Sequence, residues 1–412
     1  MAESIEATND DVMIGVAQPA ELDSILKVMC AAFRMEYEAA HPIYFNDPRL
    51  DAADKMVVRS SQKVASCVTL VQGRSNVGHA SISTCGLAGV ATAPSFQRRG
   101  YATMLVNAAL GEVARRGSNL ALLTATDPDY YLRRGWAIVG RNYSLQIDRQ
   151  KLPQTKSALR VRTMRHDDAD RADIVRSNTA HYSLKSARSA LQWSGLIDRL
   201  SGSVVVEDAT GDIAGYLLIQ NRLGKLLVSG PPVPPTVHVL EAIATGDAAR
   251  HALISWLARR PGPQCVDFEV PEVMLRNLHL VNLVGATMHV STGCLGYVTN
   301  FAASISALIP NWTDLQPKTM MLVCRYSDGC AIKVNLNVAN RSVVLVSDPS
   351  SRVRLPFAEA TADVWAQVIC GYVSAVDAIA AETLIVEGGD IHESLATMFP
   401  ARAPMLAPPD LF

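Results

Sequence analysis

Apolar residues recur with helical or strand-like spacing in three successive segments of this 412-residue chain. In the first segment, from about Ile14 to about Leu152, a helical face between Leu22 and Phe33 precedes a series of short apolar runs. The pattern predicts strands at 56–59, 64–71, 81–92, 119–125 and 136–147, an amphipathic helix between Gly100 and Gly117, and a short helix at 127–133. A helix, a series of strands and then a β-α-β unit is the order of an α/β domain.

The second segment, from about Leu159 to Val298, repeats this order, with a helix at 167–177, a hairpin at 203–219, a helix at 248–259 and a strand at 264–270. The third, from about Phe301 to Phe412, begins with an apolar helix. It then predicts strands at 320–326, 331–338 and 342–346 with an open apolar face, helix over 358–381 and an extended Pro-rich end. No long linker separates the segments, so we expect three closely packed domains of α/β and α+β class, at 1–152, 153–298 and 299–412.

The most informative local sequence joins the 81–92 strand to the helix that follows it. It reads Gly89-Val90-Ala91-Thr92-Ala93-Pro94-Ser95-Phe96-Gln97-Arg98-Arg99-Gly100-Tyr101-Ala102. A helix that opens after a loop leaves backbone N–H groups unpaired, and its dipole adds positive potential, so this place suits a pyrophosphate. Gly100 lets the backbone approach an anion and Ala102 keeps the first turn open, although an ordinary strand-to-helix turn also uses a glycine.

The string Gln-x-x-Gly-x-Ala after Val-Ala-x-Ala-Pro resembles the acetyl-CoA-binding motif of the GCN5-related N-acetyltransferases, the GNAT superfamily. The resemblance implies that acetyl-CoA binds in the first domain, with its pantetheine arm along Val90, Ala91 and Thr92. Its pyrophosphate would lie on the backbone of Arg98, Arg99, Gly100, Tyr101, Ala102 and Thr103, and Gln97 of the motif is a further cofactor-binding residue. At the corresponding point the second domain has 237–246 without this motif, which indicates either a degenerate GNAT-like domain or an unrelated α/β domain.

Tyr131 is the candidate general acid, because Tyr131-x-x-x-Gly135-Trp136 matches a pattern of the same superfamily. In GNAT enzymes a tyrosine at this place lies near the sulfur of CoA, where it can donate to the departing thiolate. The alternative is that Tyr131 caps the short helix or packs under Trp136. We expect its neighbour Tyr130 to be a packing or pocket residue.

The three-part layout resembles the Eis (enhanced intracellular survival) acetyltransferases: a GNAT domain, a degenerate GNAT-like domain and a sterol-carrier-protein-like domain. This resemblance implies direct acetyl transfer to amines of aminoglycosides and other cationic small molecules, and assembly as a hexamer. It also implies that the C-terminal carboxylate, here on Phe412, acts as general base; a frayed tail is the alternative. Glu36 and Glu38 follow the first helix, where GNAT substrates enter, and either bind a cationic acceptor or belong to a solvated helix face.

Composition narrows the function further. A formal net charge of −1 without a polybasic stretch predicts no nucleic-acid partner, and the absence of a long apolar run predicts no membrane span. An acidic start without an apolar leader, and eight cysteines without Cys-x-x-Cys, predict a cytoplasmic protein. Nine dispersed histidines predict that no metal is bound.

Two other functions stay open. One is acetylation of protein lysines or polyamines. The other is binding of a lipid or apolar ligand by the third domain, with the GNAT halves as a non-catalytic scaffold. A scaffold has no need of both the 97–102 loop and Tyr131, so the sequence favours an enzyme.

Overall fold

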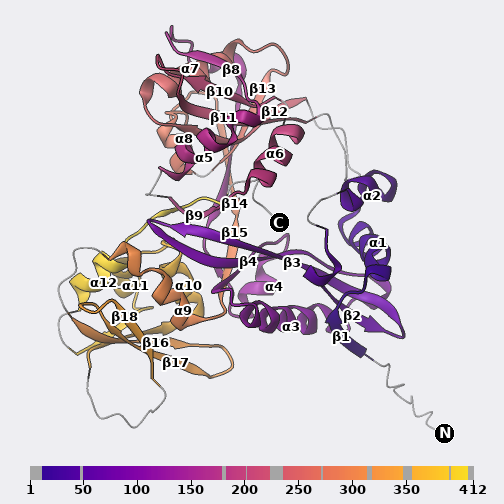
Figure 1. The fold of residues 1–412 in the computed structure, drawn as a ribbon, viewed down its shortest axis with the longest axis vertical. Helices are drawn as coiled ribbons and strands as arrows, with labels where there is room; N and C mark the ends of the chain where they lie inside the picture. Colours follow the sequence, from indigo (N-terminus) through magenta and orange to yellow (C-terminus); the bar gives the residue numbers. More distant parts are fainter. Residues whose placement is uncertain are drawn as a thin grey trace.

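Three β-sheets organise the chain in the computed structural model, which describes residues 12–46, 50–178, 182–200, 202–222, 235–270, 272–312, 318–346, 355–388 and 391–406. Figure 1 shows the sheets as three lobes that meet at long strands near the centre. Short 3-10 turns lie at 19–21, 52–54, 94–96, 149–151, 166–168 and 309–311.

The first sheet has nine strands and carries the N-terminal lobe. Its main path runs β1 (Val12–Val16), β2 (Lys55–Ser60), β3 (Lys63–Val77), β4 (Ala80–Thr92), β5 (Leu120–Thr124), β15 (Cys294–Val298) and β6 (Ala137–Ile138). At the far end of β3 the sheet continues into β9 (Tyr182–Ser186), which pairs with β21 (Ala403–Pro404).

Helices cover both faces of this sheet, and successive side chains of each strand point alternately to the two faces. Val58 packs with α3 (Tyr101–Arg115), whereas its neighbour Val57 packs with α1 (Leu22–Phe33). α2 (Tyr37–Phe45) follows α1 on the same side, and α4 (Pro128–Leu132) follows β5. The predicted strands and helices of residues 56–133 are thus confirmed, and Gly100 and Gly117 flank α3 with positive φ.

The second sheet has seven strands and forms the upper lobe of Figure 1. It runs β14 (Thr287–Thr292), β7 (Arg141–Asp148), β13 (Cys265–Glu269), β12 (Thr236–Ala244), β11 (Ile213–Arg222), β10 (Val204–Glu207) and β8 (Arg160–Thr163). Its helices are α5 (Ala169–Ser177), α6 (Ala190–Arg199), α7 (Asp247–Arg259) and α8 (Glu272–Asn277).

The third sheet has five strands, in the order β18 (Ser342–Leu345), β17 (Ala331–Asn337), β16 (Thr319–Arg325), β19 (Phe357–Thr361) and β20 (Ile385–Glu387). Its helices are α9 (Phe301–Ala307), α10 (Ala362–Ile369), α11 (Ala375–Ala380) and α12 (His392–Met398). The apolar face predicted to be open is closed: Leu322 and Leu336 are fully buried in one cluster with Phe301 of α9 and Trp365 of α10.

Two predictions of secondary structure were wrong. The run 136–147 is not one strand but β6 and β7, which belong to different sheets. The run 358–381 begins as strand β19, because pairing with β16 outweighs the helical preference of its alanines.

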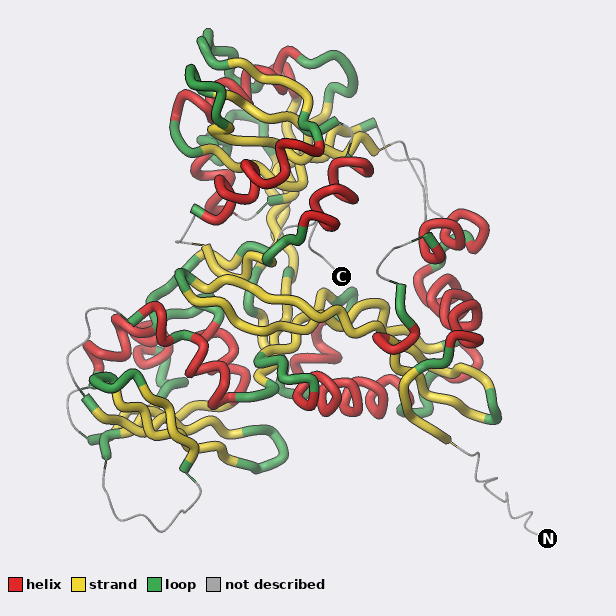
Figure 2. Tube along the Cα trace, viewed as in Figure 1, coloured by secondary structure: helices red, strands yellow, loops and turns green. Residues whose placement is uncertain are grey.

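A two-stranded ribbon joins the first two sheets. β7 pairs with β14 in the second sheet, and their continuations β6 and β15 pair in the first. The strands cross closely at two glycines: a Cβ on Gly293 would lie 2.8 Å from the carbonyl oxygen of Gly140. Figure 2 shows this ribbon as yellow strands running between the lobes. The sheets therefore exchange strands across the predicted limit at residue 152, and the domain limits remain predictions.

Candidate active site

The first sheet opens where β4 and β5 stop pairing. The two strands pair in parallel from Thr84 to Gly86 of β4, and β4 continues to Thr92 beyond the last paired position. Parallel strands that separate expose backbone groups at their carboxyl ends, which is where ligands bind in open α/β sheets.

A β-bulge lies on β4 in this opening. Cys67 of β3 pairs with Ala91 and Thr69 pairs with Ala88, so Gly89 and Val90 oppose a single residue of β3. Gly89 adopts a φ of 60°, which glycine reaches at little cost.

The bulge reverses the direction of the side chains that follow it. Leu87 and half-buried Val90 contact the α3 cluster, whereas Ala91 contacts the α1 cluster. α1 approaches the bulge closely, because a Cβ on Gly89 would lie 2.9 Å from Cε of Met29.

The predicted anion loop lies at the end of β4, with exposed side chains at 97–99. Arg98 and Gly100 adopt φ values of 63° and 82°, and the first helical hydrogen bond of α3 runs from the Met104 N–H to the Gly100 carbonyl, at 3.0 Å. The N–H groups of 101–103 precede that bond, so they are the ones a helix leaves without an intrahelical acceptor. Gln97 braces the loop by donating from Nε2 to the Thr92 carbonyl, at 3.3 Å.

Tyr131 is 9% exposed, and burial raises its pKa to about 12. Its ring meets Tyr130 and Trp136 edge to face, at centroid distances of 4.9 and 5.7 Å. The raised pKa keeps the hydroxyl protonated at neutral pH. Within the described part of the chain this hydroxyl has no hydrogen-bond partner, so it is free to donate.

Tyr130 ties the short helix α4 to the first turn of α3. Its hydroxyl lies 3.0 Å from Oγ1 of Thr103, and the Arg134 guanidinium covers its ring at 3.9 Å. These contacts agree with a packing role for Tyr130 and bring Tyr131 beside the helix N-terminus.

Aromatic residues from distant segments extend the ring contacts of Tyr131 and Trp136. The ring centroid of Trp136 lies 5.6 Å from that of Tyr297 on β15, and the centroid of Tyr297 lies 6.4 Å from that of Tyr326, which follows β16. Sequence reasoning missed both tyrosines, since no local spacing connects them to the motif at 131–136.

The residues predicted to bind the cationic acceptor substrate, Glu36 and Glu38, follow α1. Glu36 precedes α2 and Glu38 lies in its first turn, and both are exposed. Between them, the Tyr37 hydroxyl donates to Asp23 of α1.

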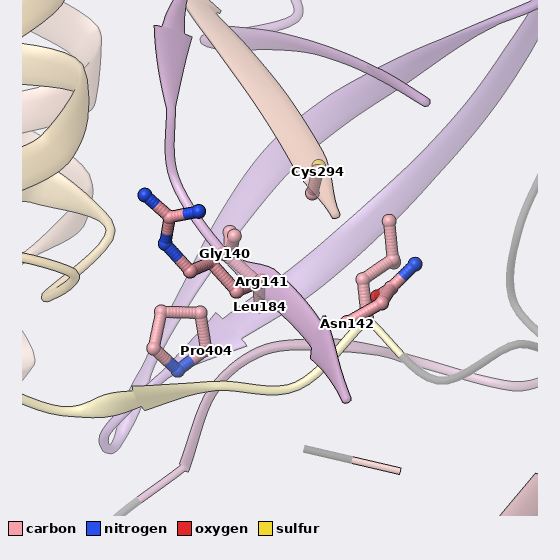
Figure 3. A pocket seen from close by; sticks show the side chains of 7 residues that line it. Gly140, Arg141, Asn142, Leu184, Cys294 and Pro404 are labelled. Atoms are coloured by element: carbon pink, nitrogen blue, oxygen red, sulfur yellow. The ribbon is translucent and has the colours of Figure 1, made fainter. Parts of the chain in front are cut away.

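Phe412, the predicted base, lies outside the described residues. The described chain ends at Leu406, which is 6% exposed and lines a pocket with Cys294, Gly140 and Pro404 (Figure 3). Cys294 pairs with Thr124, so this pocket adjoins the carboxyl end of β5.

The second sheet repeats part of this arrangement. β12 and β13 pair in parallel from Thr236 to Val239, and β12 continues to Ala244. The region 237–246 is therefore almost entirely strand, and α7 begins at Asp247 directly after Thr245 and Gly246.

One group of potential metal ligands escaped the sequence analysis, because its members are far apart in the chain. His238, Asp267 and Glu269 place one ligand atom each within 4.8 Å of the others. Protein donors already occupy these carboxylates: His238 contacts Glu269, and Ser144 donates to Asp267 at 2.6 Å. The group therefore carries no metal assignment.

Among the described residues, no helix is long and apolar enough to cross a membrane.

Residues 14–139 match the family model of the acetyltransferase (GNAT) domain. They include β1 to β6, the bulge, the loop and Tyr131, so this part of the chain is a GNAT acetyltransferase domain and places the protein among acyltransferases. No curated protein matches the chain.

Solved structures resemble nearly the whole chain. A GCN5-related N-acetyltransferase from Kribbella flavida is 18% identical with a TM-score of 0.77, covering 96% of this chain and 97% of its own. A probable N-acyltransferase from Enterococcus faecalis is 13% identical with a TM-score of 0.77, covering 97% and 99%. Eis1 from Mycobacterium abscessus is 16% identical with a TM-score of 0.69, covering 95% and 98%. The resemblance to Eis proteins is thus confirmed at the level of the fold.

Proposed function

We propose that the chain is an acetyl-CoA-dependent N-acetyltransferase whose reaction centre lies where β4 and β5 separate. One observation supports this most strongly: the bulge at Gly89 and the loop at 97–103 both lie beyond the last pair between β4 and β5, inside the GNAT domain. Tyr131 lies next to Tyr130, whose hydroxyl is within hydrogen-bond distance of Thr103 in the first turn of α3. The pantetheine arm lies along Val90, Ala91 and Thr92, and the pyrophosphate accepts hydrogen bonds from the backbone of 98–103.

Transfer is direct. The free amine attacks the thioester carbonyl carbon, a C–N bond forms, the C–S bond breaks, and CoA leaves as a thiolate that takes up a proton. Tyr131 donates a hydrogen bond or a proton to this thiolate, because its phenol is neutral and its hydroxyl has no hydrogen-bond partner among the described residues. The proton lost by the amine goes to a base.

The C-terminal carboxylate of Phe412 is the proposed base. Residues 407–412 span at most about 20 Å when extended, and they follow Leu406 in the pocket that adjoins the end of β5. A carboxylate also attracts an ammonium ion and so orients the acceptor.

The proposed acceptors are cationic small molecules such as aminoglycosides, with Glu36 and Glu38 at the entrance for the positive charge. The resemblance of the sequence to the Eis family implies this acceptor class and the proposed hexamer, and the likeness to Eis1 is one of fold. Polyamines and lysine peptides carry the same reacting group and form the comparison set.

A thiol-release assay with acetyl-CoA across aminoglycosides, polyamines and lysine peptides tests the proposal. We expect turnover with at least one aminoglycoside, and a higher melting temperature with millimolar acetyl-CoA. No release with any amine, together with no thermal shift, would contradict it.

The base is tested separately by adding two glycines after Phe412. The added residues move the negative charge several ångströms away and leave a neutral amide near the amine. We expect kcat/KM to fall by roughly 100-fold while acetyl-CoA binding persists. A matched N-terminal extension serves as the control, and equal activity of the two would rule the terminal carboxylate out.

A further inference from the structure

Packing alone sets the direction of the Tyr131 hydroxyl. Within the described residues this hydroxyl has no hydrogen-bond partner, so nothing but the contacts of the ring fixes the phenol. The Tyr131 ring contacts the rings of both Tyr130 and Trp136. Tyr130 is held by Thr103 and Arg134, both in the GNAT domain.

The contact with Trp136 depends on a residue from far along the chain. Trp136 is 1% exposed and its buried Nε1 finds no acceptor in the described part of the chain, so ring contacts hold this side chain too. Behind it lies Tyr297, which stands between Trp136 and Tyr326. Aromatic side chains fix one another through the geometry of such contacts.

Tyr326 belongs to the lobe of the third sheet and is itself well fixed. It closes the hairpin between β16 and β17, where its N–H donates to the Cys330 carbonyl at 2.8 Å and its carbonyl accepts from Gly329 at 3.0 Å. The next residue, Ser327, lies against the turn after α4: its Oγ would be 3.4 Å from a Cβ on Gly135. The third lobe therefore contacts both the ring series and the turn that carries Tyr131.

We propose that Tyr326 is a positioning residue for the acetyl transfer, acting through Tyr297 and Trp136 on the orientation of Tyr131. This inference rests on the proposed role of Tyr131 as acid. It makes the third lobe part of the catalytic apparatus rather than an attached module. A misplacement of the donor by about 1 Å is enough to cost 10- to 100-fold in rate.

A double-mutant cycle tests the proposal in the full-length chain, with kcat measured for the best acceptor of the panel. Tyr326→Leu removes the ring, and we expect kcat to fall about tenfold with KM for acetyl-CoA unchanged. Tyr326→Phe keeps the ring and should retain activity within about twofold. Tyr326→Met fills the space with a flexible chain and replaces the leucine variant if that variant melts below the assay temperature.

The decisive measurement is the effect of Tyr326→Leu in a Tyr131→Phe background. If Tyr326 acts through the phenol, its substitution costs little once the hydroxyl is gone, so the two losses are not additive. Additive losses, or full activity of both Tyr326→Leu and Tyr326→Met, would overturn the inference and leave the role of Tyr131 intact. Full activity of Tyr131→Phe alone would instead overturn the proposed acid.

Discussion

The first two sheets each present a parallel pair of strands followed by a helix, yet they differ in what joins strand to helix. In the first, residues 93–100 separate β4 from α3 and include Arg98 and Gly100 with positive φ. In the second, only Thr245 and Gly246 separate β12 from α7. The short connection has no room for a loop that encircles a pyrophosphate.

The two helix starts also differ in charge. The loop before α3 carries two exposed arginines, Arg98 and Arg99, and α3 has no acidic residue in its first turn. α7 begins with Asp247, whose carboxylate is paired with Arg250 at 2.7 Å. This carboxylate already uses the positive potential of the helix N-terminus and would repel a phosphate.

Side chains also line the second opening. Tyr182, Met274 and Leu278 border the pocket beside the end of β12, and Asn277 donates to the Tyr182 hydroxyl at 3.0 Å. The proposed cofactor site at the first sheet combines separated strands with a longer connection, two exposed arginines and a phenol without a hydrogen-bond partner among the described residues. At the second sheet the strands separate as well, but the connection is two residues long and an acidic residue begins the helix.

The largest expected effect is a loss of kcat that distinguishes Tyr131 at the first opening from Tyr182 at the second. Tyr131→Phe keeps the ring and removes the hydroxyl, so we expect kcat to fall by roughly 100-fold or more with acetyl-CoA affinity unchanged. Tyr182→Phe, the matched change at the second opening, should leave kcat within about twofold. Steady-state kinetics would break the comparison if the two variants lost activity equally.

A smaller effect, on the thermal stabilisation by acetyl-CoA, distinguishes Gly100 before α3 from Gly246 before α7. Gly100→Val forces a branched residue to a φ of 82° in the anion loop, so the thermal stabilisation by acetyl-CoA should disappear. That stabilisation amounts to about 2.7 kcal/mol at 100 times Kd.

Gly246→Val is the matched control, because Gly246 has an extended φ of −170° that any residue adopts. Differential scanning calorimetry should show the full shift in this variant. A shift that survives in Gly100→Val would place the cofactor elsewhere.

The smallest effect concerns a buried charge between the two lobes. Lys185 of β9 is 1% exposed and donates to the Arg176 and Ser177 carbonyls at 3.2 and 3.3 Å. Burial, with the nearby Arg176 guanidinium, lowers the pKa of Lys185 to about 8. The folded state therefore binds fewer protons than the unfolded state between about pH 8 and the ordinary lysine value, so stability rises with pH there.

Urea titrations of the wild type and Lys185→Met from pH 8 to pH 10 measure the contribution of Lys185 to the pH dependence of stability. We expect the free energy of unfolding of the wild type to gain about 1–2 kcal/mol relative to the variant. Thiol release under the same conditions should show equal kcat for both proteins, since the group lies outside the first opening. A kcat that follows Lys185 would show that this buried group takes part in the chemistry.

Local sequence was enough for the parts of the site that local geometry builds. The loop and α3 follow from apolar spacing between Gly100 and Gly117, and the motif at Tyr131 spans a single turn. The bulge at Gly89 was not foreseen, because only its pairing with β3 distinguishes it from regular strand.

Contacts between distant segments set the rest. The alternation of 136–147 continues across Gly140, so the sequence alone does not show that the strand changes sheets there. The pairing of β15 with β5, and the contacts of Tyr297 with Trp136 and Tyr326, come from folding of the whole chain. These contacts join segments that are far apart in the sequence, so no short stretch of sequence predicts them.

The ribbon shared by the first two sheets determines when the first sheet can be completed during synthesis of the chain. β5 ends at Thr124, but its neighbour β15 begins only at Cys294, so the first sheet stays incomplete on the ribosome until the second lobe has been synthesised. N-terminal domains usually fold first during synthesis, and pairings between distant segments fold slowly. Until β15 pairs with it, the edge of β5 exposes backbone N–H and C=O groups that are open to pairing with other chains.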